Sequence, residues 1–289
     1  MIGSGESADP AALVDPAVIV GSVADGVFAE QPYVSPTPEQ REDAGIGLAR
    51  LIAGYLAGAN EVLAGLGFTV SSDTDPVTGR RYALAVSQTS GEQVWGLYLV
   101  DLSAPPGLCI AVPHPKFDAD CEQLALRLWR SVPGSILALA AVHRKAAGGT
   151  ADPARNLESV FHHLWTTIVG PRGIPQVQIH GFADTTAAEQ VVVSTGAGPR
   201  SPTAVRIADE IAATGLIVTR NWDGTADRDL RAVTNSQGIA AAASGWVWVH
   251  LEHNRTVRTE PALWHPAIDA VATAIAPPHA RPRTRNAPP

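Results

Sequence analysis

The 289-residue chain has only two cysteines, Cys109 and Cys121, too few for a disulfide framework. Its 21 lysines and arginines are outnumbered by 28 aspartates and glutamates, and this net charge of −7 argues against nucleic-acid binding. No uninterrupted apolar stretch approaches the ~20 residues of a membrane span. The N-terminus has no basic segment ahead of an apolar one, as a signal peptide would. We therefore expect a soluble cytoplasmic protein with no membrane partner.

The distribution of proline, serine and apolar residues predicts one main domain. Hydrophobic residues make up 45% of the chain, enough for a sizeable core. Residues 1–36, punctuated by proline and serine, are interpreted as an N-terminal arm. Residues 37–276 are predicted to form a single α/β hydrolase-like domain, with an extension at 37–104 and the core at 108–276. The Pro-rich stretch 277–289 lacks large apolar residues, so we interpret it as a disordered tail.

The extension is predicted to contain a helical segment followed by a β-hairpin. Thr37 and Gln40 have the spacing of a capping box, and Pro38 lies at the first helical position. Apolar residues recur at helical spacing until Gly67, which is a stop signal. The runs RRYALAVSQT and EQVWGLYLVDL then form two β-like segments joined by a short Ser-Gly turn, which indicates a hairpin at one edge of a sheet.

From residue 108 onward, apolar strands alternate with amphipathic helices. The predicted strands are 108–113, 135–143, 175–180, 190–194, 215–220 and 246–252, and the predicted helices are 119–132, 156–169, 202–214, 236–244 and 261–275. This alternation is typical of an α/β fold with a mostly parallel or mixed central sheet covered on both faces. In such sheets, ligands bind beyond the carboxyl ends of the strands.

Two histidines at predicted strand ends suggest a metal site at that edge. His114 follows LCIAV and precedes a helix, and His180 ends PQVQIH. A catalytic zinc ion takes three protein ligands and keeps one position for water. His114, Glu122 and His180 would supply these ligands, with Asp118 as the alternative carboxylate or as a residue that orients a ligand. We expect one Zn²⁺ ion, although such ligands do not select zinc uniquely.

A glutamate at the end of the last predicted strand completes the candidate catalytic group. Glu252 follows the apolar run WVWVHL, and an acidic residue there must reach solvent, pair, or lie in a functional cleft. As a general base it would take a proton from water and return it to the leaving amine. Pairing with Arg255 or Arg258 is the structural alternative. His250 and His253 flank it without forming an HExxH motif, and we assign them no metal role.

Other polar residues near the same edge are candidates for substrate binding. His143 and Arg144 follow another predicted strand, and Arg144 or Arg255 could hold a substrate carboxylate through the planar guanidinium group. Asn156 and Asn235 stand at predicted helix starts, where their amides either cap the helices or line the pocket. We predict that these five residues contact the substrate.

The order of His114 with a carboxylate, then His180, then Glu252 resembles a wide group of zinc enzymes. That group includes the N-formylglutamate amidohydrolases, the zinc-dependent N-acetylmuramoyl-L-alanine amidases and the poly-γ-glutamate hydrolases. The resemblance covers residues 108–258, and the stretch 143–156 is similar to the Arg-rich Asp/Asn segment of the formylglutamate amidohydrolases. It implies a three-layer α/β/α sandwich and zinc-dependent cleavage of an amide or peptide bond in a small-molecule, peptide or acyl-amino-acid substrate. VPHPKFDADCE lacks the His-Gly-Gly or Pro-His-Ser-Gly signature, so the substrate stays open.

Two alternatives compete with the zinc hydrolase. Ser194 follows the apolar run VVV, as a serine nucleophile could, but no G-x-S-x-G elbow is present. The departures from family signatures also suit a non-catalytic binding or assembly module that keeps the fold without the chemistry. The sequence predicts no particular oligomeric state.

Overall fold

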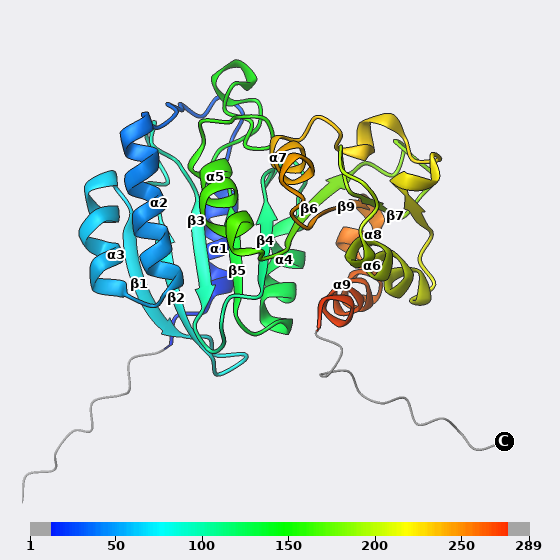
Figure 1. Cartoon of the computed structure of the whole chain (residues 1–289), viewed down its shortest axis with the longest axis horizontal. Coiled ribbons are helices and arrows are strands. Elements are labelled where there is room, and N and C mark those ends of the chain that lie inside the picture. Colours follow the sequence, from blue (N-terminus) through cyan, green and yellow to red (C-terminus); the bar gives the residue numbers. More distant parts are fainter. Residues whose placement is uncertain (1–12, 277–289) are drawn as a thin grey trace, which may run out of the picture.

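The computed structural model describes residues 13–276 and builds them around one mixed sheet with helices on both faces (Figure 1). This arrangement confirms the predicted α/β class. The expected disordered tail and the first part of the expected arm lie outside the described residues. Within residues 13–276, none of the helices combines the length and hydrophobicity needed to cross a bilayer.

Nine strands of the described chain pair in the order β1-β2-β3-β5-β4-β6-β9-β7-β8. The pairs β4–β5, β4–β6, β6–β9 and β7–β8 are parallel, and the others are antiparallel. Their bounds are β1 Thr69–Thr74, β2 Arg81–Val86, β3 Leu97–Asp101, β4 Leu108–Val112, β5 Ser135–Leu139, β6 Gln176–Phe182, β7 Val191–Ser194, β8 Val218–Arg220 and β9 Trp248–Asn254.

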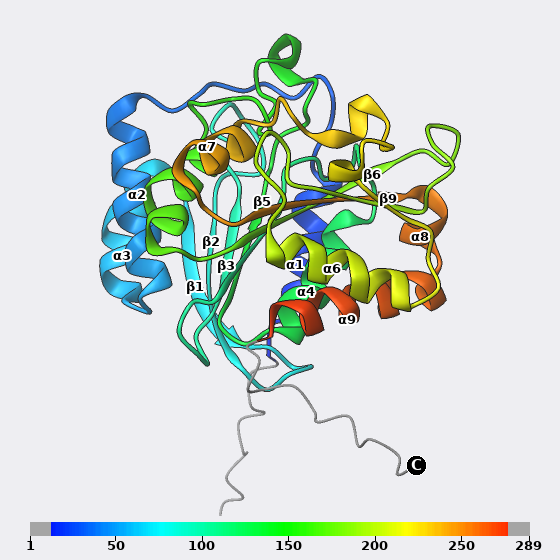
Figure 2. The same cartoon turned by 45° about the vertical axis from the view of Figure 1, so that its right-hand side comes forward.

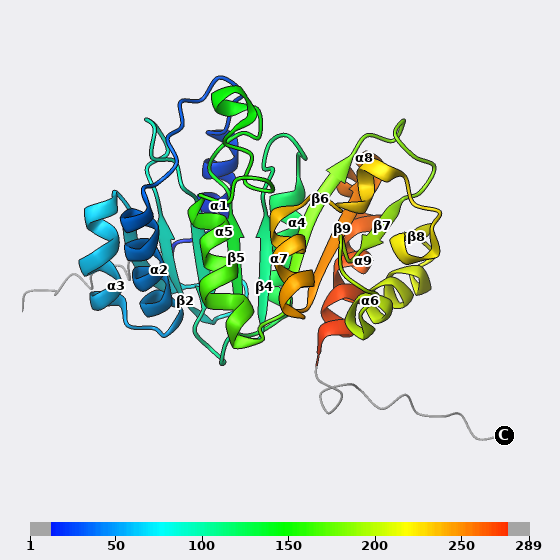
Figure 3. The same cartoon turned by 45° about the horizontal axis from the view of Figure 1, so that its top comes forward.

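The helices form two layers, as Figure 2 and Figure 3 show from different sides. One face of the sheet packs on α1 (Pro16–Asp25), α4 (Cys121–Ser131), α6 (Pro202–Ala213) and α9 (Pro261–Ile275). The other packs on α2 (Pro38–Ile52), α3 (Leu56–Leu63), α5 (Val160–His163) with its π-helical continuation Leu164–Val169, and α7 (Ser236–Ser244). The short α8 (Arg255–Thr259) follows β9 directly. Each layer therefore has its own hydrophobic core, as a three-layer sandwich requires.

The predicted elements are present, with shifted ends. The capping box of Thr37 and Gln40 starts α2, and the hairpin β2–β3 joins the sheet beside β5. The helical segment is broken at Gly54, whose positive φ of 75° ends the first helix. The strand expected at 135–143 ends at Leu139, and α5 begins after the N-cap Ser159. Apart from short 3-10 helices, the elements that were not predicted are α1 within the expected arm, the exposed edge strand β1, and α8.

Alternation along two central strands positions the polar residues of the site. On β6 and β9, Ile179 and Leu251 belong to the core under α4 and α9. Successive side chains on a strand point to opposite faces, so His180, His250 and Glu252 all face the α5 and α7 layer. The paired strands are parallel, and their carboxyl ends meet at one edge.

Candidate metal centre

The first histidine of the site lies in a tight turn between β4 and α4. The amide of Asp118 donates to the carbonyl of His114, at 2.9 Å, which folds the chain back after the strand. Lys116 and Asp120 adopt left-handed backbone conformations, with φ of 68° and 73°. Because Asp120 turns the chain in this way, α4 starts only at Cys121. Asp118 therefore belongs to the turn rather than to the helix, and its side chain faces the strand ends.

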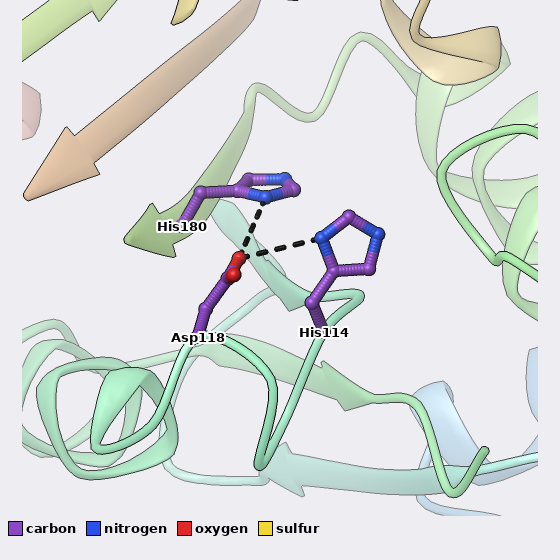
Figure 4. Close-up of side chains that lie close together, drawn as sticks. All are labelled: His114, Asp118 and His180. Atoms are coloured by element: carbon purple, nitrogen blue, oxygen red, sulfur yellow. Dashed lines mark hydrogen bonds and ion pairs between the residues drawn. The ribbon is translucent and has the colours of Figure 1, made fainter. Parts of the chain in front are cut away.

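This turn brings His114 and Asp118 together with His180 of β6 (Figure 4). Nδ1 of His114 lies 3.3 Å and Nδ1 of His180 lies 3.1 Å from the same oxygen, Oδ2 of Asp118. Each of the three residues is at most 4% exposed. Two ligands at ~2.1 Å from a tetrahedral zinc ion are themselves ~3.4 Å apart. The separations and the His₂Asp donor set therefore fit a zinc ion.

The outer nitrogens of both histidines have their own partners. Nε2 of His114 lies 2.8 Å from Oδ1 of Asp152, and Nε2 of His180 lies 3.4 Å from Oε1 of Gln178. Such contacts fix the tautomer and the orientation of a ligand ring. When the only ring proton lies on Nε2, the Nδ1 lone pair of each histidine would be available to an ion beside Asp118, in place of the contact that Nδ1 makes with Oδ2.

The charges in the cluster are strongly coupled. Burial by itself would raise the pKa of Asp118, but hydrogen bonds from His114 and His180 lower it well below its usual range. Burial would also lower the pKa of His114, yet contacts with Asp118 and Asp152 raise it overall. For His180 burial prevails and its pKa falls. A cation placed among these side chains would take over the role that the His114 proton plays in balancing two carboxylates.

Glu252 lies beside His180 on the neighbouring strand, where the two residues are register partners. Burial, followed by the negative charge of Asp118, raises the pKa of Glu252 well above its usual value. Its Oε2 is buried and has no hydrogen-bond partner among residues 13–276. Glu252, His180 and Asp118 together line a cleft of about 870 Å³, whose wall also contains Arg144. The carboxyl group of Glu252 thus lies at the wall of the cleft, beside the His114–Asp118–His180 cluster.

The carboxylate preferred from sequence, Glu122, is not part of this cluster. Glu122 lies in the first turn of α4, on the wall of a separate pocket that also contains Asp25 and Lys116. Asp118, the alternative, lies between the two histidines instead. The correction follows from the turn, because Asp120 delays the helix and directs the two carboxylates to different sides.

The five candidate substrate residues lie in different places. Arg144 lines the cleft and touches Asp152 at 3.3 Å, and Asn235 lines the same region while donating to Gln178 at 2.9 Å. Arg255 also lines the cleft but pairs with Asp120 at 2.9 Å. His143 accepts a hydrogen bond from the amide of Lys145 instead. Asn156 donates to Tyr33 and Ser35 of the N-terminal segment.

Three residues of the site were not recognised in the sequence. Asp152 lies in the stretch 143–156 that resembles the Arg-rich Asp/Asn segment, but no contact with His114 was predicted for it. His250 was set aside, yet its Nε2 lies 3.6 Å from Oε1 of Glu252. Gln178 donates to Gln237 at 3.0 Å and so anchors a buried amide network. The sequence does indicate Gln178 and His250, because the polar-apolar alternation of QVQIH and WVHLE is unusual for central strands.

Ser194, the nucleophile of the alternative serine hydrolase, is fully buried at the end of β7. Its hydroxyl donates to the carbonyl of Arg231 at 2.5 Å and accepts from the amide of Gly196 at 2.9 Å. Ser194 is the register partner of His250, but these two bonds to the backbone use its hydroxyl for turn formation. The geometry gives no support to nucleophilic chemistry at this serine.

Comparisons with known proteins give only remote similarities. No family model matches the chain, and no curated protein does. Among solved structures, the chain is similar to a metallo-carboxypeptidase from Burkholderia cenocepacia (TM-score 0.42, 14% identity, 83% of this chain and 70% of that one). It is also similar to a metallo-carboxypeptidase from Pseudomonas aeruginosa (TM-score 0.40, 15% identity, 74% and 68%) and to the LapA aminopeptidase of Legionella pneumophila (0.37, 10%, 95% and 77%). Similarities this remote assign no activity to the chain.

Proposed function

We propose that the protein is a metal-dependent hydrolase that cleaves an amide or peptide bond. The observation that carries this proposal is the buried His114–Asp118–His180 cluster, with a solvent-accessible cleft beside it and Glu252 on the adjoining strand. Each Nδ1 would be available to an ion in the tautomer that carries the proton on Nε2, which the partner of the Nε2 nitrogen favours. Zinc is the ion that best suits this nitrogen and carboxylate set.

His114, Asp118 and His180 would hold the ion, which when bound polarises a carbonyl group and acidifies water. Glu252 would act as the general base. It accepts a proton from the attacking water at a carboxylate oxygen and transfers that proton to the departing amine nitrogen. Its burial excludes bulk water from the carboxylate, so the proton stays available for the amine.

Arg144 is the residue we propose for binding a substrate carboxylate. It lines the cleft together with His180 and Glu252, and Asp152 and the ring of Phe117 hold its guanidinium group in place. A planar guanidinium group forms two parallel hydrogen bonds with a carboxylate. Arg144→Ala should therefore raise KM for peptides or acyl-amino acids with a free carboxylate, and leave KM for their amidated analogues unchanged.

The glutamate is tested by replacing Glu252 with glutamine in the zinc-loaded protein. Loss of a general base lowers kcat about 10²- to 10⁴-fold, while zinc content should stay at the wild-type value because the three ligands remain. Glu158→Gln, at an exposed position on the surface, is the matched control and should keep full activity. Substrates would be N-acyl amino acids and short peptides, with release of the free amine as the readout.

Full turnover by Glu252→Gln would remove this residue as the base. Zinc bound to a wild-type protein that hydrolyses none of these amides would contradict the enzymatic proposal. The alternative of a binding module that retains the fold would then take its place.

A further inference from the structure

A second group of potential metal ligands adjoins the first. His250 and Glu252 lie two residues apart on β9, so they face the same side of the sheet. In the parallel pairing with β6, Glu252 stands opposite His180 and His250 stands opposite Gln178. Each of the three residues His180, His250 and Glu252 offers one donor atom, and these three atoms lie within 4.8 Å of one another.

The donor atoms of this group are not fully used by other contacts. Nε2 of His250 and Oε1 of Glu252 are 3.6 Å apart, which is too long for a hydrogen bond. This separation is close to the ~3.4 Å between two ligand atoms that each lie ~2.1 Å from a tetrahedral zinc ion. In the part of the chain that the structure describes, Oε2 of Glu252 is buried and has no hydrogen-bond partner.

The group opens to space that an ion could enter. A small cavity of about 90 Å³, lined by His180, His250 and Glu252, also contains Asp152 and Asn235 in its wall. The rings of His180 and His250 lie close together, with centroids 4.3 Å apart and planes inclined by 40°. Within the described residues, Nε2 of His250 has the 3.6 Å contact with Glu252 and no hydrogen bond that would compete with an ion.

We propose that His180, His250 and Glu252 form a second site for a divalent cation such as zinc, which shares the His180 ring with the first site. This inference rests on the proposed function, because the first ion binds Nδ1 of His180. The second ion then needs Nε2 and must displace its proton to solvent. Since that proton lies near Oε1 of Gln178, we expect the second ion to bind more weakly than the first.

A consequence for regulation follows from the shared glutamate. A cation bound to Glu252 occupies the lone pairs that otherwise accept a proton from water. Filling the second site should therefore inhibit hydrolysis, so that activity rises with the first equivalent of zinc and falls with the second.

The test is a zinc titration of metal-stripped, untagged protein at buffered free-zinc concentrations, followed by elemental analysis of bound zinc per chain. We expect two binding steps, with activity highest after the first. His250→Phe, which has a similar shape, and the smaller His250→Leu should remove the second step and the inhibition while keeping the first. Retention of the first step also shows that each variant is folded. His265→Phe on α9 is the matched control and should keep both steps.

The outcomes separate this inference from the proposed function. A single equivalent in the wild type, without inhibition at higher zinc, would overturn the second site and leave the hydrolase proposal intact. Two equivalents that persist in both His250 variants would place the second ion elsewhere and also overturn it. No bound zinc at all would overturn the proposed function together with the inference.

Discussion

Replacing Asp152 with asparagine should weaken metal binding although Asp152 is not itself a proposed ligand. Oδ1 of Asp152 lies 2.8 Å from Nε2 of His114, and its side chain is only 7% exposed. The carboxylate holds the proton on that nitrogen and makes the opposite nitrogen a stronger donor. Asparagine keeps the shape but removes the charge. Its amide group would face the guanidinium of Arg144, which in the wild type lies 3.3 Å from Oδ2 of Asp152.

The expected loss follows from the role of such outer partners. Their substitution typically weakens metal affinity 10- to 100-fold, which corresponds to about 1.4–2.7 kcal/mol. The dissociation constant for zinc would be measured by competition with a chromophoric chelator at neutral pH. Thermal unfolding of the metal-free protein would report whether the fold is preserved.

A matched control is Asp269→Asn on α9. This substitution breaks an ion pair with Arg127, at 2.7 Å, that is partly exposed and far from the cluster. Exposed pairs contribute about 0–1 kcal/mol to stability, so zinc affinity should not change. Wild-type zinc affinity in a folded Asp152→Asn variant would refute the assignment of His114 Nδ1 as a ligand held in place by this carboxylate.

Three further substitutions test other parts of the account. Gln178→Leu removes the oxygen that accepts a hydrogen bond from the buried amide of Asn235. Leaving that amide unpaired should lower the free energy of unfolding by about 1–3 kcal/mol, measured by urea titration. An unchanged urea midpoint would contradict this prediction. Burial alone raises the pKa of Asp75, but hydrogen bonds from Arg130 outweigh it and lower the pKa below 3.8. Asp75→Asn should therefore lower the free energy of unfolding by about 2 kcal/mol at pH 7. This difference from the wild type should shrink as the pH falls below 3.8 through the folded-state pKa of Asp75. A difference that stays constant with pH would contradict the contribution of the Asp75–Arg130 pair. Ser194→Ala should leave kcat unchanged, whereas abolished turnover would restore the serine alternative.

Much of the sheet could be predicted because its central strands are short apolar runs bounded by turn signals. LCIAV and SILAL are buried on both faces, and the sequence shows this directly. The edge strand β1 was missed because TVSSDT is largely exposed and carries no apolar alternation. Helix α1 was missed because the prolines and serines of residues 1–36 indicate an arm, whereas Pro16 occupies the first turn of a helix after the N-cap Asp15.

The site was predictable only where local sequence determines position. His180 and Glu252 end apolar runs, so their placement at one sheet edge follows from parallel pairing. The choice between Asp118 and Glu122 depends on the positive φ of Asp120, which a non-glycine residue rarely adopts and the sequence does not signal. Asp152 comes from the long connection after β5, where no periodicity fixes the chain, and only the fold brings it to His114.

The most direct test of the central claim is the zinc content of untagged protein equilibrated at low free zinc, compared between wild type and His180→Ala. We predict about one zinc ion per wild-type chain, the number that one three-ligand site holds, and none in the variant. His265→Ala should bind zinc as the wild type does. Absence of bound zinc from the wild type after reconstitution at neutral pH, or equal zinc in the wild type and His180→Ala, would contradict the metal centre described for this chain.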